Sequence, residues 1–89
     1  MANLKGETSK GFAYEIQEQD LDNMELIDAL ADLDEGNVLA TSKVLTLLLG
    51  KDQKKKFYDF YRNENGKVPL ATISEAIAEL LSNHGETKN

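Results

Sequence analysis

The longest apolar run of the chain lies at its centre, in the sequence KVLTLLLG at residues 43–50. On a helix, the apolar side chains of this run point in nearly every direction, so they have to be buried on most sides. The run predicts a helix over residues 38–49, which Asn37 can cap and Gly50 can end. One neighbouring helix would leave Leu47 or Leu49 in water. We therefore expect a second packing partner, either from elsewhere in the chain or from another subunit.

A second helix is predicted over residues 22–35. Asp22 is a good N-cap and Glu25 stands three residues later, which is the spacing of a capping box. The apolar side chains of this helix fall on one face and its acidic side chains on the other, before Gly36 stops it. The acidic face, which includes Asp28 and Asp32, is either a solvated surface or a contact surface for a basic partner.

Two further helices are predicted over residues 52–62 and 69–82. The first is basic at its start and places its aromatic side chains, Phe57, Phe60 and Tyr61, on an inward stripe. The second carries one apolar stripe along its length. The side chains that we expect to be buried in the core of the four helices are Leu30, Leu45, Leu48, Phe57, Ile73 and Ile77.

The amino-terminal part of the chain has a different pattern. Phe12, Tyr14 and Ile16 alternate with other residues, which predicts a short half-buried strand. Residues 1–11 are a flexible arm or the first strand of a hairpin. The sequence thus predicts a mostly α fold, a compact bundle of about four helices in one domain over residues 12–84. A short amino-terminal extended segment or β-hairpin precedes it, and residues 85–89 are expected to form a disordered tail.

Composition adds a tendency to associate. The chain has 89 residues and no cysteine, so neither a disulfide nor a cysteine-based metal site can reinforce so small a core. We therefore expect self-association. There is no apolar run of about 20 residues and no basic start followed by an apolar segment, so neither membrane insertion nor secretion is expected. The expected location is the cytoplasm.

Charge is distributed unevenly along the chain. Residues 1–50 contain ten acidic residues and three lysines, whereas residues 51–67 contain six basic and three acidic residues. The basic helix can be a solvated face over core aromatics, a docking face for an acidic protein or a nucleic-acid surface, and the net charge of −6 argues against the last. The candidate partner-binding residues are Leu47, Leu49, Lys54, Lys55, Lys56, Asp28 and Asp32.

No residue pattern indicates catalysis, a cofactor or a metal site. The sequence around Asn63 and Gly66 resembles the middle of a calcium loop, but Tyr61 and Thr72 stand where the strongest ligands of such a loop belong. It is therefore interpreted as a turn. His84 is the only histidine, and it stands at the edge of a polar tail without a pocket. We expect a protein that is not an enzyme.

Five segments together resemble small prophage proteins of Gram-positive bacteria, and among them the tail assembly chaperone group of long-tailed phages. They are FAYEI at residues 12–16, LDNMELIDAL at 21–30, KVLTLLLG at 43–50, NGKVP at 65–69 and ISEAI at 73–77. The resemblance covers residues 12–82 and consists of helix caps and core stripes, so it transfers no site residue.

That resemblance implies a mostly helical, non-catalytic protein in the cytoplasm of the bacterial host. Such a protein binds the tape measure protein, keeps the helices of that protein soluble, helps to bring tail tube subunits to it and leaves before the particle is finished. The alternative is a small acidic regulatory or protein-interaction module of a prophage.

Overall fold

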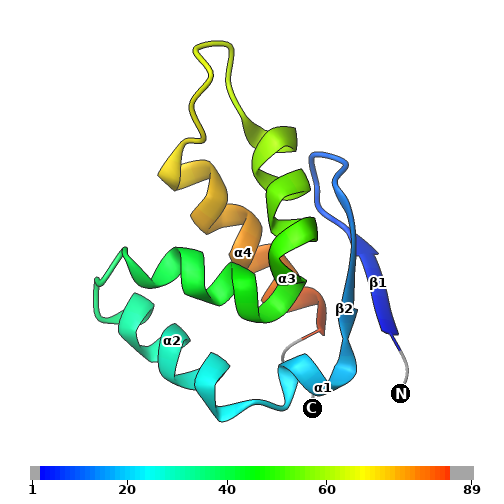
Figure 1. Ribbon diagram of the computed structural model, residues 1–89, viewed down its shortest axis with the longest axis vertical. Helices are drawn as coiled ribbons and strands as arrows, with labels where there is room; N and C mark the ends of the chain where they lie inside the picture. The colour runs from blue at the N-terminus through cyan, green and yellow to red at the C-terminus, as the bar shows by residue number, and fades with distance from the viewer. Residues whose placement is uncertain (1–2, 85–89) are drawn as a thin grey trace.

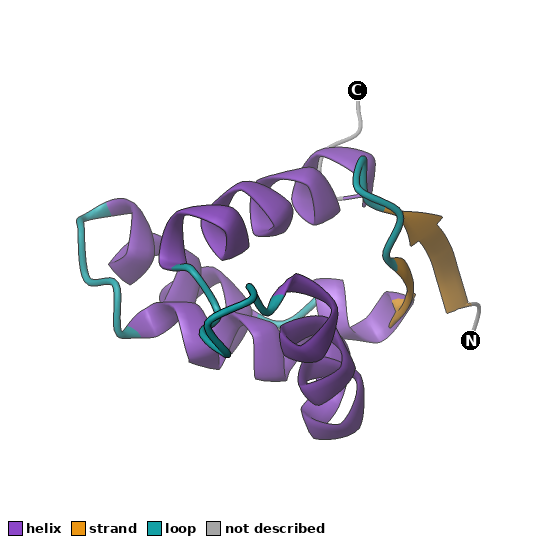
Figure 2. Ribbon diagram, turned by 90° about the horizontal axis from the view of Figure 1, so that it is seen from above, coloured by secondary structure: helices purple, strands orange, loops and turns teal. Residues whose placement is uncertain are grey.

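The computed structural model describes residues 3–84 and shows a mostly helical fold with an amino-terminal hairpin (Figure 1). Seen from above, the two strands lie at one end of the helical part (Figure 2). The predicted fold class is confirmed at this level. The predicted tail at residues 85–89 lies outside the described residues. The elements in chain order are β1 (Asn3–Glu7), β2 (Ala13–Gln17), α1 (Glu18–Leu21), α2 (Met24–Asp34), α3 (Ala40–Tyr61) and α4 (Leu70–His84).

The long helix α3 is two helical arms that meet at Gly50. This residue has φ 78° and ψ 166°, a backbone conformation that is essentially confined to glycine. Figure 1 shows the two arms running in clearly different directions. The predicted break at Gly50 is confirmed. The first arm begins at Ala40 rather than at Val38, because residues 37–40 form a turn in which the Ala40 N–H donates to the Asn37 carbonyl.

The predicted start of a helix at Asp22 is wrong. Asp22 follows the last residue of α1, and its N–H donates to the Gln19 carbonyl. The N-cap of α2 is Asn23, whose side-chain oxygen accepts the Glu25 N–H at 3.0 Å. Two adjacent residues were suitable caps, and the chain uses the second because α1 takes up the residues before it.

The amino-terminal segment is a β-hairpin, so the hairpin alternative is confirmed. Its strands are antiparallel, with Leu4 opposite Ile16 and Lys5 opposite Glu15. Tyr14 and Ile16 are buried, as the alternating pattern predicts. An isolated two-stranded hairpin is marginal in water, so the contacts that fix this one to the helices decide whether it forms.

Gln53 makes the main polar connection between the hairpin and α3. Its side-chain oxygen accepts the Glu15 N–H at 2.7 Å, and its side-chain nitrogen donates to the Glu15 carbonyl at 2.8 Å. The carboxamide therefore pairs with the backbone of β2 as a neighbouring strand would. At the hairpin turn, the Thr8 and Tyr61 hydroxyls lie 2.7 Å apart.

The core is formed around the first arm of α3, as the central apolar run predicts. Leu45, Leu48, Phe57, Ile73 and Ile77 are all buried, which confirms five of the six predicted core residues. The sixth, Leu30, is only half-buried. The second packing partner of the central helix comes from the same chain, because β2, α1, α2 and α4 all contact α3.

Candidate functional site

The two apolar candidates from the sequence are mostly used inside the fold. Leu49 is buried, with 7% of its surface exposed, so its predicted availability to a partner is wrong. The strand β2 and the helix α1 contact α3 in addition to α2 and α4, so α3 has packing partners beyond one neighbouring helix. Leu47 is half-buried and packs against the core.

The three lysine candidates differ from one another. Lys54 is half-buried, and its ammonium donates to the Ser42 and Thr46 hydroxyls, each at 2.9 Å. The same ammonium lies 5.7 Å from the centre of the Tyr58 ring. Lys55 and Lys56 are exposed. Sequence reasoning treated the three as equivalent, but the second arm of α3 turns only Lys54 back over the first arm.

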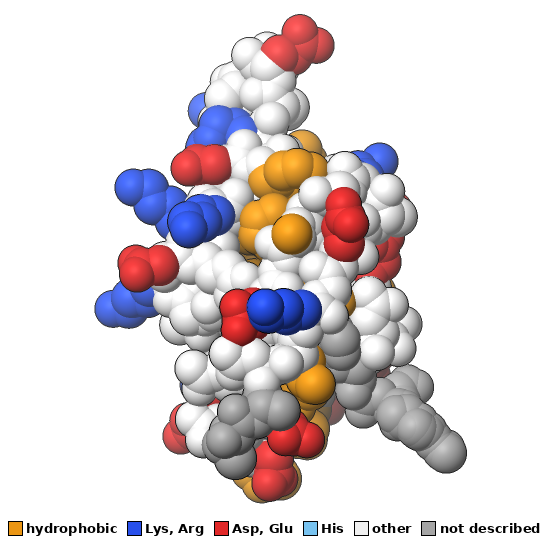
Figure 3. Space-filling model, turned by 90° about the vertical axis from the view of Figure 1, so that its right-hand side faces the viewer, with side chains coloured by type: hydrophobic (Ala, Val, Ile, Leu, Met, Phe, Trp, Pro, Cys, Tyr) orange, Lys and Arg blue, Asp and Glu red, His pale blue; other side chains and the backbone are white. Residues whose placement is uncertain are grey.

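The acidic candidates Asp28 and Asp32 are both exposed on α2. Neither takes part in an ion pair, since Arg62 and Asp59 form the only one found within residues 3–84, at 3.0 Å. The structure therefore does not join the acidic and basic candidates into one site. On the hairpin side, lysine and arginine side chains gather along one edge with acidic side chains between and beside them (Figure 3).

The exposed apolar side chains point to a different surface, at the junction of the α2–α3 turn with the start of α4. Leu39 is 83% exposed, Val38 51% and Leu70 48%, which is unusual for side chains of this size so close together. They surround a groove of about 250 Å³. The apolar residues that line this surface, here called the α3–α4 groove, are Val38, Leu39, Tyr58, Val68, Leu70 and Ile73.

Local sequence explains why these residues lie together. Asn37 accepts the Leu39 N–H through its side chain, which turns the chain into α3 and leaves Val38 and Leu39 outside the helix. At the other wall, Pro69 precedes α4 and its carbonyl accepts the Ile73 N–H. Leu70 thus lies in the first turn of α4, beyond the reach of the core.

Two polar residues complete the α3–α4 groove. Thr41 lines it, and although Thr41 is only 6% exposed, its hydroxyl has no hydrogen-bond partner. A buried hydroxyl left in this state costs about 1–3 kcal/mol. Ser42 also lines the groove and holds the Lys54 ammonium. The site is therefore apolar, with one unused hydroxyl and one fixed positive charge at its rim.

A larger depression of about 740 Å³ lies between the hairpin and α3. Its lining includes the carboxylates of Glu15, Asp20 and Asp52 together with Lys56 and part of Leu47. Most of its polar side chains can be hydrated in the open depression, so they do not require a partner. Phe60, another exposed apolar side chain, already packs against Phe12 and Tyr61.

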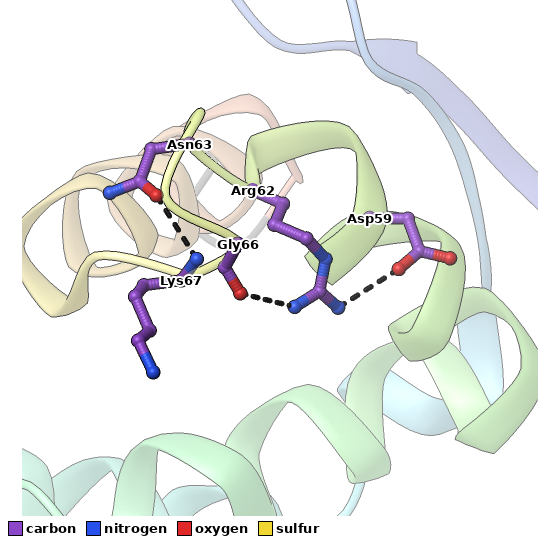
Figure 4. A network of polar contacts seen from close by, with 5 residues as sticks. All are labelled: Asp59, Arg62, Asn63, Gly66 and Lys67. Carbon is purple, nitrogen blue, oxygen red and sulfur yellow. Dashed lines mark hydrogen bonds and ion pairs between the residues drawn. The ribbon is translucent and has the colours of Figure 1, made fainter.

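The loop that resembled a calcium site is held together by its own atoms (Figure 4). The side-chain oxygen of Asn63 accepts the N–H groups of Asn65 and Lys67 at 2.9 and 3.0 Å. The Arg62 guanidinium donates to the Gly66 carbonyl at 3.0 Å. Asn63 is therefore a turn-forming residue. In the described part of the chain, no three His, Cys, Asp or Glu side chains gather where a metal ion could be held.

None of the helices within residues 3–84 has the length and apolar character needed to cross a membrane. Comparisons with protein-family models, with curated proteins and with solved structures found no match to the chain.

Proposed function

We propose that this protein is a non-catalytic, protein-binding chaperone like those that assist phage tail assembly. The observation that carries the proposal is the α3–α4 groove, where large apolar side chains remain exposed beside a buried hydroxyl without a partner. Exposed apolar surface of this kind is typical of sites that bind other proteins. No chemistry is required of such a site.

The proposed partner is the tape measure protein of a long-tailed phage, and the resemblance at residues 12–82 supports this choice. A long helical protein exposes apolar stripes before the tail closes around it, and a small acidic partner can cover those stripes and keep the complex soluble. We further propose that the same complex brings tail tube subunits to the growing tail, in the cytoplasm of the bacterial host.

The test is co-expression with the tape measure protein whose gene we expect to find beside the gene for this chain. We expect the tape measure protein to become soluble and to copurify with the chain. We also expect the gene for a tail tube protein to lie before the gene for this chain, and the gene for the tape measure protein to lie after it. If the neighbouring genes encode no tail protein, or if the tape measure protein stays insoluble with the chain present, the proposal is wrong.

A regulatory role is the second candidate. It is favoured by the exposed carboxylates of Asp28 and Asp32 on α2, which have no ion-pair partner within the described residues. An acidic helix face of this kind can bind a basic protein. This role would be favoured over the first if the chain copurified with a basic protein that is not a tail protein, and if Asp28→Asn combined with Asp32→Asn abolished that copurification.

A further inference from the structure

Resting on the proposed function, we propose that the α3–α4 groove binds one amphipathic helix of the partner protein. This helix inserts apolar side chains between Leu39 and Leu70 and places a carboxylate against the Lys54 ammonium. The proposal thus specifies both the surface that binds and the chemistry of what it binds.

The apolar part of the partner follows from the lining and size of the groove. Leu39 has most of its surface exposed on one side of the groove, and Leu70 about half of its surface on the other. Tyr58, Val68 and Ile73 also line the groove. Its volume of about 250 Å³ is several times the roughly 30 Å³ that a water molecule occupies in the liquid. Apolar side chains of a partner fit such a space and remove its lining from water.

The helical form of the partner follows from the absence of a strand edge at the groove. Its lining residues belong to the α2–α3 turn, α3, α4 and the segment just before α4. The hairpin lies at the far end of the helices (Figures 1 and 2). An extended peptide would find no row of backbone groups to pair with, whereas a helix satisfies its backbone internally.

The acidic part of the partner follows from the position of Lys54. Its ammonium contacts Ser42 and Tyr58, both of which line the groove. These contacts hold the ammonium at the rim, and no carboxylate within residues 3–84 pairs with it. A carboxylate on the partner would meet a positive charge that is already positioned, so little further ordering is needed.

The first experiment uses two synthetic helical peptides of about 18 residues, a length at which isolated helices begin to be stable. Both carry leucines on one face, and they differ only in having glutamates or lysines beside that face. We expect fluorescence anisotropy to show that the glutamate peptide binds about five to ten times more tightly. Lys54→Met should remove most of this difference, whereas the matched change at the exposed Lys51, Lys51→Met, should preserve it.

The second experiment tests the apolar wall. Leu39→Ser should weaken both peptides at least about fivefold, and because Leu39 is 83% exposed, the fold should tolerate the change. Met24→Ser is the matched control, since Met24 is 67% exposed on α2, outside the groove. The proposal would be overturned if Leu39→Ser and Met24→Ser changed peptide affinity equally, or if Lys54→Met and Lys51→Met changed the difference between the two peptides equally. It would also be overturned if neither peptide bound. Loss of self-association in Leu39→Ser alone would overturn it as well, because the occupant would then be a second copy.

The co-expression assay separates this inference from the proposed function. If the chain and its Leu39→Ser variant solubilise the tape measure protein equally well, the proposed function stands and the groove is not its binding site. If the peptides bind as expected but the tape measure protein stays insoluble, the groove stands as a helix-binding site and the proposed function is wrong.

Discussion

Leu48 is the residue whose loss should damage the core most directly. It lies near the end of the first arm of α3, two residues before Gly50, and is only 1% exposed. Leu48→Ala should lower the free energy of unfolding by about 2–5 kcal/mol, because it removes buried apolar surface and leaves a cavity. Urea unfolding followed by circular dichroism measures the change.

The adjacent Leu47 provides the control for this experiment. Leu47 is half-buried, so Leu47→Ala removes the same atoms from a site that is partly open to water. Its effect on the free energy of unfolding should be clearly smaller than that of Leu48→Ala. A loss below about 1 kcal/mol for Leu48→Ala would contradict the central position of this helix.

Ser9 and Glu79 tie the hairpin turn to α4 and make this contact sensitive to pH. The Ser9 hydroxyl and N–H donate to the Glu79 carboxylate at 2.6 and 2.7 Å. The hydroxyl first, then the N–H and the charge of Lys10, lower the pKa of Glu79 below its ordinary value of 4.5. The contact therefore stabilises the fold above about pH 4.5, and the stabilisation is lost as the pH falls through the lowered pKa.

The prediction concerns the slope of stability against pH. Urea midpoints should fall as the pH is lowered below about 4.5, and Ser9→Ala should make this fall shallower, because Glu79 then titrates closer to its unfolded value. Ser74→Ala, at an exposed serine of α4, should leave the slope unchanged. The same slope in Ser9→Ala and in the unchanged protein would contradict the prediction.

At the scale of the elements, Gly50 decides the shape of α3. Its φ of 78° with ψ of 166° is strained for any residue with a Cβ, although a Cβ would meet no atom within 4 Å. Gly50→Ala should therefore cost about 1–3 kcal/mol through the backbone alone. Thermal unfolding measures this cost, and the exposed helical Lys51→Ala should stay within about 0.5 kcal/mol. A neutral Gly50→Ala would show that the two arms can join into one straight helix.

The elements that are best predicted from the sequence are those whose helix-ending residues and apolar periodicity indicate the same boundaries. Gly50 ends an apolar run and breaks α3. The apolar stripe that contains Ile73 and Ile77 belongs to α4, whose ends lie close to the predicted ones. The start of α2 was misplaced because Asp22 and Asn23 both have the chemistry of an N-cap. Only the preceding helix α1, whose four residues carry no periodic signal, decides between them.

The candidate site could not be predicted in the same way. The sequence predicts Phe60 on an inward stripe and includes Val38 and Leu70 in two helices with apolar faces, but all three side chains are exposed by 45% or more. No element within residues 3–84 buries Val38 or Leu70, and whether one does depends on how α3 and α4 approach each other. Leu49 shows the reverse, because it is buried in a helix that also contacts β2, a strand that is remote in sequence.

At the scale of the whole molecule, the uneven charge is hardly used inside the fold. The single ion pair found within residues 3–84 joins Arg62 to Asp59, both from the basic segment. The acidic surface of α2 and the exposed Lys55 and Lys56 on the second arm of α3 therefore remain available to other molecules. Lys54 differs from these two lysines, because Ser42 and Thr46 hold its ammonium at the rim of the α3–α4 groove.

These unlike surfaces predict that copies of the chain associate head to tail, with α2 of one copy against the second arm of α3 of the next. Such a contact builds rings or open chains rather than closed two-fold dimers. Light scattering should show a species larger than the monomer at high protein concentration, and added salt should weaken it because exposed charges are screened.

Lys55→Glu combined with Lys56→Glu should weaken the association further without loss of the helical signal. Lys5→Glu combined with Lys67→Glu changes the net charge equally but lies elsewhere, so it should have a smaller effect. A protein that stays monomeric at every concentration, or equal effects of the two double variants, would show that the charge asymmetry does not drive assembly.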